Sequence, residues 1–125
     1  MEVQIVEKHE NMVRVNTTIG FFYGIWCSPV PAELRKYIVE LDSDDVLTLE
    51  TIRLSNSSEP CISCLDGIIY LNGVVEEIQD GLIFLRLHKS IMMLEISPHF
   101  DFSMFFNQFV CVRLHGINLF DTGLC

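Results

Sequence analysis

Two cysteines, Cys61 and Cys64, have the residue type and spacing in this chain that most directly indicate chemistry. A Cys-x-x-Cys pair supplies half of a tetrahedral zinc site, and the same spacing serves thiol–disulfide exchange. There is no second pair in the sequence, so Cys27, Cys125 or a histidine would have to complete a zinc site in space. A redox role requires a helix that begins at the first cysteine, whereas this pair precedes a predicted antiparallel strand. Five cysteines without an export signal indicate free thiols, so we expect no bound zinc and no cofactor.

The four histidines form no recognisable catalytic or metal-binding motif. No pair has the helical spacing of zinc ligands, and none lies beside an evident nucleophile. The Gly-x-Ser-x-Gly, Ser-x-x-Lys and phosphate-loop patterns are also absent from the sequence. We therefore expect a protein that is not an enzyme, with an active site built from scattered residues as the remaining alternative. The histidines are His9, His88, His99 and His115.

Acidic residues gather in two predicted turns, and these are the candidate partner-binding residues. Their spacing does not match the alternating oxygen ligands of an EF-hand, so we expect no metal there. Solvated turns need polar residues in any case, and that is the alternative explanation. The functional interpretation is an acidic surface on which a basic protein docks. The first turn contains Asp42, Asp44 and Asp45, and the second contains Glu76, Glu77 and Asp80.

The overall charge narrows the choice of partner. The chain has 17 acidic and 8 basic residues, which gives a net charge of −9. This balance repels the phosphates of nucleic acids and anionic membrane surfaces, so we expect a protein partner, no nucleic acid and no membrane. No apolar run approaches the roughly 20 residues of a membrane helix, and the acidic start MEVQIVEKHE does not resemble a signal peptide. We therefore expect a cytoplasmic protein.

The stretch from Gly67 to Ile96 is the predicted centre of the fold. Short apolar runs alternate there with turn residues, which is typical of an antiparallel meander. Asn72-Gly73 predicts a turn or a bulge, and Gln79-Asp80-Gly81 predicts a reversal of the chain. The strongest strand runs from Leu82 to Leu87. It places one set of side chains in the core, either Ile83, Leu85 and Leu87 or the alternate face of the strand.

The flanking sequence adds further short strands and little helix. We expect one strand over Val46–Leu54, another after a bulge at Gly116, one helical turn over Ala32–Lys36 and a short helix over Phe102–Phe106. No internal repeat is evident. The pattern predicts one domain, 1–125, that is all-β or nearly so. It is expected to be antiparallel, as a partly open barrel or a two-sheet sandwich with one or two short helices, and we favour the barrel.

About a third of the chain consists of three segments that share a resemblance: Tyr37–Asn56 (YIVELDSDDVLTLETIRLSN), Gly73–Leu87 (GVVEEIQDGLIFLRL) and Gly116–Gly123 (GINLFDTG). They resemble small bacterial immunity proteins of polymorphic toxin and contact-dependent growth inhibition systems. Such proteins bind and neutralise a cognate toxin domain, often a basic nuclease, inside the cell. The resemblance implies that role here. These families share no universal motif, so the resemblance transfers no site residue.

Two interpretations of function follow. The first is an immunity protein that blocks a basic toxin domain by occlusion, with acidic side chains facing lysines and arginines of the toxin. The second is a β-barrel binding module for a peptide or a small ligand. In that case the aromatic stretches Phe21–Trp26 and Phe100–Phe106 would line its pocket.

Overall fold

A computed structural model describes residues 1–124 and confirms that the protein is nearly all β. Within these residues there are twelve strands and one short 3₁₀ turn. The elements are β1 (Glu2–His9), β2 (Met12–Thr17), β3 (Gly20–Trp26), β4 (Lys36–Asp42), β5 (Val46–Leu47), β6 (Ile52–Leu54), β7 (Cys61–Leu65), β8 (Ile68–Gln79), β9 (Leu82–Leu87), β10 (Ser90–Ile96), η1 (Ser103–Phe105), β11 (Phe109–Leu114) and β12 (Asn118–Asp121).

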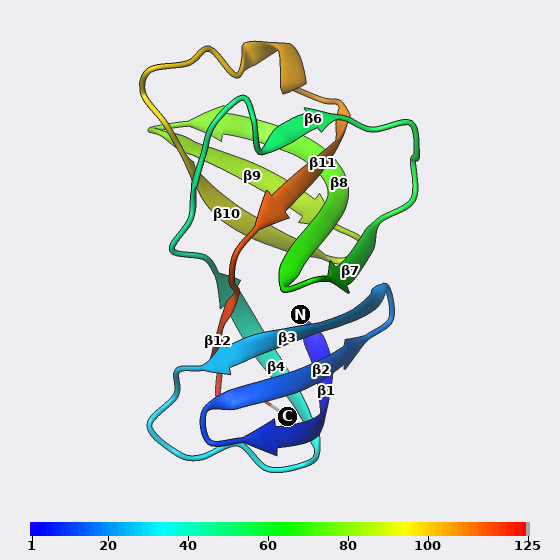
Figure 1. Ribbon diagram of the computed structural model, residues 1–125, viewed down its shortest axis with the longest axis vertical. Coiled ribbons are helices and arrows are strands. Elements are labelled where there is room, and N and C mark those ends of the chain that lie inside the picture. The colour runs from blue at the N-terminus through cyan, green and yellow to red at the C-terminus, as the bar shows by residue number, and fades with distance from the viewer. Residues whose placement is uncertain (125) are drawn as a thin grey trace.

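The strands form two lobes, one above the other in Figure 1. The lower lobe holds β1, β2, β3, β4 and β12, paired in the order β12-β4-β1-β2-β3. Because β3 also pairs with β12, these five strands close into a barrel. The upper lobe holds the predicted central meander β8-β9-β10, with β11 on one side and β5 on the other. β6 pairs with β11, and the turn at Thr48–Thr51 connects it to β5.

The two lobes repeat the same strand arrangement. The β2–β3 ladder pairs Val13 with Gly24, and the β9–β10 ladder pairs Ile83 with Leu94, so both numbers differ by 70. The same offset of 70 converts every partner pair of β1–β2 and β2–β3 into a partner pair of β8–β9 and β9–β10. It also converts the irregularity after Ile5 in β1 into the one after Val75 in β8. The sequence contains no evident repeat, and the structure shows one in its strand registers.

The last strand of each repeat lies in the opposite lobe. β5 follows β4 in the chain but pairs in parallel with β10, where Leu47 lies opposite Ile96. β12 follows β11 but pairs in parallel with β3, where Leu119 lies opposite Trp26. In Figure 1 the red β12 accordingly lies among the blue and cyan strands of the lower lobe. Each lobe is thus completed by a strand from the other half of the chain.

The predicted core is confirmed, and it extends across both lobes. Ile83, Leu85 and Leu87 are at most 1% exposed. Residues at the equivalent places of the first repeat, Val13 and Val15, are also fully buried. The described residues contain no helix that is long and apolar enough to span a membrane.

Two local expectations were wrong, each because tertiary contacts decided the structure. The segment Val46–Leu54 is broken into β5 and β6 by the turn at Thr48–Thr51. Asn72-Gly73 continues β8 without a turn, because Gly73 lets β8 approach β9 closely. A Cβ there would collide with the Arg86 carbonyl oxygen. A strand does follow Gly116, as expected, but it is the separate strand β12, because the chain crosses into the other lobe between β11 and β12.

Helix is scarcer than the sequence predicted. No helical turn forms over Ala32–Lys36, because its backbone groups bond to side chains: the Lys8 amine donates to the Ala32 carbonyl at 2.7 Å, and the Tyr37 hydroxyl accepts from the Glu33 N–H at 2.9 Å. The helix predicted over Phe102–Phe106 is present only as the 3₁₀ turn η1.

Candidate partner-binding surface

The first acidic turn lies where the chain crosses from one lobe to the other. One Asp45 carboxylate oxygen accepts hydrogen bonds from the backbone N–H of His115 at 2.8 Å and lies 2.9 Å from its Nδ1. The Asp44 carboxylate accepts from the Asn118 side-chain amide at 3.2 Å. Ser43 joins the same two segments through its hydroxyl, which donates to the Gly116 carbonyl at 2.8 Å. Two of the three predicted aspartates therefore brace the crossing of the two linkers.

Asp42 differs from its two neighbours. It is exposed at the end of β4, and its side chain makes no hydrogen bond or ion pair within residues 1–124. In the first turn, it is therefore the aspartate whose carboxylate is left to solvent or to a partner.

The second acidic turn contains one paired and two unpaired carboxylates. Glu76 forms a two-pronged ion pair with Arg86, whose Nη2 lies 3.1 Å from Glu76 Oε2. The hydrogen bonds from Arg86 lower the pKa of Glu76 below its ordinary value of 4.5 and raise that of the guanidinium. Glu77 and Asp80 are exposed and have no hydrogen-bond or ion-pair partner among the described residues. Asp80 also has a conformational role, since its φ of 53° and the 76° of Gly81 form the tight β8–β9 turn.

A set of exposed apolar side chains adjoins this turn. The loop between β10 and β11 packs along the β8 bulge, because the Asn107 N–H donates to the Val75 carbonyl at 2.7 Å and the Val75 N–H donates to the Gln108 carbonyl at 3.0 Å. Two of the aromatic rings in this loop pack into the core. They are Phe102 and Phe105, while Phe100, Met104 and Phe106 are exposed.

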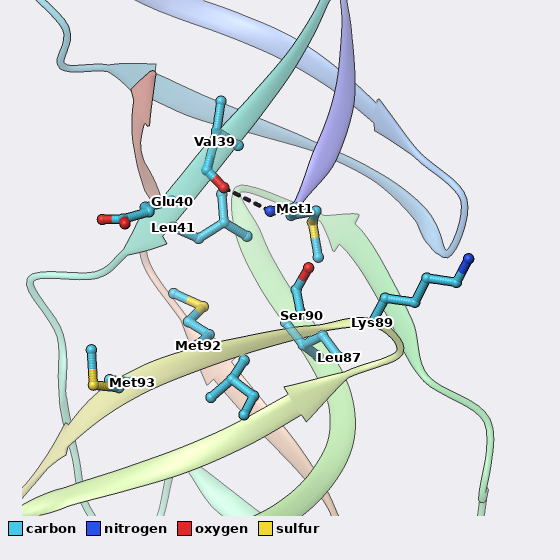
Figure 2. A pocket seen from close by; sticks show the side chains of 10 residues that line it. Met1, Val39, Glu40, Leu41, Leu87, Lys89, Ser90, Met92 and Met93 are labelled. Atoms are coloured by element: carbon cyan, nitrogen blue, oxygen red, sulfur yellow. Dashed lines mark hydrogen bonds between the residues drawn. The ribbon is translucent and has the colours of Figure 1, made fainter. Parts of the chain in front are cut away.

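One cavity of about 380 Å³ lies between the lobes (Figure 2). It is lined by Met1, by Val39–Leu41 of β4, and by Leu87 and residues 89–93 of the β9–β10 hairpin. The N-terminal amine donates to the Val39 carbonyl at 2.7 Å, and partial burial lowers the pKa of this amine below 8.0. In Figure 2 the charged ends of Glu40 and Lys89 extend away from the cavity. The cavity is thus a gap in the seam between lobes, without converging charged groups.

A second pocket of about 520 Å³ has more varied chemistry. Phe21 and Tyr23 of β3 form one wall, and the guanidinium carbon of Arg14 lies 4.6 Å from the Phe21 ring centroid. Asp66 and His115 lie at its rim. The Arg14 Nε is buried and has no hydrogen-bond partner among the described residues. This pocket therefore offers an aromatic wall and an unpaired donor, and it uses part of the predicted stretch Phe21–Trp26.

The cysteines are separate thiols in the described part of the chain. Cys61 is exposed, Cys64 is half-buried, and both are free. Residues 1–124 contain no cluster of three or more histidine, cysteine, aspartate or glutamate side chains suited to hold a metal ion. Cys125, which the sequence offered as a further ligand, lies outside the described residues.

Comparison of the chain with protein-family models, with curated proteins and with solved structures returned no match.

Proposed function

We propose that this is a cytoplasmic immunity protein that binds a cognate basic toxin domain, of the nuclease type, and neutralises it by occlusion. The observation that carries the proposal is a set of exposed carboxylates without partners in a chain of net charge −9. In this set are Asp42, Glu77 and Asp80. The three segments described above resemble immunity proteins, and this resemblance suggests that the partner is a toxin domain.

Charge would act in two ways in such a complex. Exposed carboxylates speed the encounter with a basic surface, and this effect fades as salt screens charges beyond roughly 8–10 Å. A carboxylate that becomes buried against an arginine of the toxin slows dissociation instead. Truncating such a group costs about 2–5 kcal/mol of binding free energy. The protein itself performs no chemistry in this mechanism, because covering the nucleic-acid-binding cleft of the toxin is sufficient.

The test is protection of cells from the toxin. The proposal requires a toxin-bearing C-terminal domain encoded next to this gene. That domain is expressed with the parent protein, with an empty vector, or with the double variant Glu77→Gln, Asp80→Asn. We expect the parent to restore growth and the double variant to protect less well as toxin expression increases. Growth arrest in the presence of the parent protein, at expression levels that match the toxin, would refute the proposal.

The pocket around Arg14 supports a second candidate function, the binding of a carboxylate-bearing small ligand or peptide. An unpaired buried Nε is costly unless a ligand or water satisfies it, and the adjoining aromatic wall suits a planar group. Benzoate is a suitable probe because it combines both features. We expect saturable NMR shifts at Arg14 and Phe21 that disappear in the variant Arg14→Gln. Shifts that are absent or non-saturable would exclude this candidate.

A further inference from the structure

We infer that the toxin docks on the outer end of the upper lobe, through a patch made of Phe100, Met104 and Phe106 and bordered by the carboxylates of the β8 bulge and β8–β9 turn. We call these three residues the tip patch. This inference rests on the proposed function, and it identifies the surface through which the protein binds the toxin. The loop with its 3₁₀ turn is the ochre segment at the top of Figure 1.

The tip patch is exposed although its loop is firmly held. Phe100, Met104 and Phe106 are 44%, 59% and 55% exposed. Between them in sequence, Phe102 and Phe105 are at most 4% exposed and anchor the loop in the core. An ordered loop that presents large apolar side chains to water needs little further ordering on binding, which preserves affinity.

Backbone hydrogen bonds fix the shape of this loop. The Phe105 N–H donates to the Phe102 carbonyl at 3.0 Å, and the Phe106 N–H donates to the Ser103 carbonyl at 3.2 Å. The Asp101 carboxylate accepts from the Ser103 N–H at 2.9 Å, and this bond lowers the pKa of Asp101 below 3.8. Asp101 therefore stays ionised within the loop near neutral pH.

The repeat provides an internal comparison for this surface. The equivalent loop of the lower lobe, residues 27–35, contains the Glu33–Arg35 ion pair, whereas the upper loop contains Asp101. The carboxylates of Glu77 and Asp80 have counterparts in the lower lobe, because Glu7 and Glu10 occupy the same places in the first repeat. The lower loop contains no aromatic residue. Since the same fold accommodates both loops, the aromatic exposure of the upper loop is not required for folding.

This combination matches the anatomy of a protein interface. Apolar anchors at the centre carry most of the binding energy, and a charged rim supplies specificity and speed. The rim here is acidic, with Glu77, Asp80 and Asp101 exposed and Glu76 balanced by Arg86. The complementary occupant is a basic domain with an apolar patch bordered by lysines and arginines, as expected of the toxin.

The test compares two loop variants in binding to the toxin domain encoded next to this gene, inactivated by an active-site substitution. The tip variant is Phe100→Ser, Met104→Ser, Phe106→Ser, and the matched control is Val30→Ser, Leu34→Ser in the lower loop, where both residues are exposed. We expect the tip variant to weaken binding about 100-fold or more, and the control to remain within about threefold of the parent. Hydrogen exchange of the parent complex should show protection over residues 75–81 and 100–108.

The outcomes separate the two proposals. Binding of the tip variant within threefold of the parent, or protection confined to other segments, would overturn the docking face and leave the inhibitory function intact. Failure of the parent itself to bind would instead refute the proposed function, and the docking face with it. Circular dichroism and melting curves that match the parent establish that the variants are folded.

Discussion

Asp42 and Asp45 are three positions apart in one acidic turn, yet their surroundings differ. Asp45 is 18% exposed and bonded to His115, whereas Asp42 is exposed and unbonded within the described residues. Composition marks both as turn residues, and local sequence contains no sign of the contact with His115, which is 70 positions away. The sequence therefore predicted a polar connection after this strand correctly, although the connection is a linker between lobes and not a tight turn. It could not distinguish structural carboxylates from available ones.

This difference predicts opposite results for two alanine substitutions. Asp45→Ala removes the acceptor of the His115 N–H, so we expect it to lower the free energy of unfolding by about 1–3 kcal/mol. Asp42→Ala should change stability by less than about 0.5 kcal/mol. Urea denaturation followed by tryptophan fluorescence measures both. Equal effects of the two substitutions would contradict the bracing role of Asp45.

The pairing of Glu76 with Arg86 predicts a specific pH response. The Glu76 pKa is lower in the folded protein than in the unfolded chain, so the unfolded chain binds more protons as the pH falls. The stabilisation is complete above about pH 4.5 and is lost as the pH falls through the lowered pKa. Carbon-detected NMR titration should give a Glu76 midpoint below 4.5, which Arg86→Gln raises. A midpoint that does not change in Arg86→Gln would show that another group lowers this pKa.

Among the structural elements, the hydrophobic periodicity correctly predicted those strands and turns that depend on local sequence. The alternation of Leu82–Leu87 and the turn at Asp80-Gly81 predicted β9 and its hairpin correctly. Residues 4–26 and 74–96 have a single identical pair, Glu7 and Glu77, so the repeat is not visible in residue identity. It appears in the registers because burial and strand pairing, rather than residue identity, define it.

The junction of β3 and β7 tests how the lobes are joined. The Ile62 N–H donates to the Ile19 carbonyl at 2.9 Å, and a Cβ on Gly20, whose φ is +140°, would collide with the Ile62 carbonyl oxygen. We therefore expect Gly20→Ala to destabilise the fold by about 1–3 kcal/mol. Gly116→Ala is the control, since a Cβ there meets nothing within 4 Å. Calorimetric melting that places both variants at the parent value would show that this junction relaxes freely.

At the scale of the whole molecule, strand exchange makes each lobe dependent on the other half of the chain. If the second half of the chain is removed, the barrel of the lower lobe loses β12. If the first half is removed, the sheet of the upper lobe loses β5. Sequence could not reveal this arrangement, because β5 and β12 are two and four residues long and their pattern does not specify a partner. The choice of partner depends on the crossing linkers around Asp45 and Gly116.

We therefore predict that both lobes unfold in one cooperative transition. Trp26, the single tryptophan, reports on the lower lobe, and hydrogen exchange of the β9–β10 amides reports on the upper lobe. The two probes should give the same midpoint in urea, within error. Protection of β9–β10 that persists after the fluorescence transition is complete would contradict the mutual dependence of the lobes.

Stoichiometric inhibition in solution tests the central claim most directly. If a toxin domain is encoded next to this gene, as the proposed function requires, that purified domain is titrated with the parent protein, and its residual nuclease activity is measured at low and at physiological salt. The account predicts that activity falls linearly to zero at one equivalent, and that the association rate decreases as salt rises from about 50 to about 150 mM. Full nuclease activity in the presence of excess parent protein would contradict it.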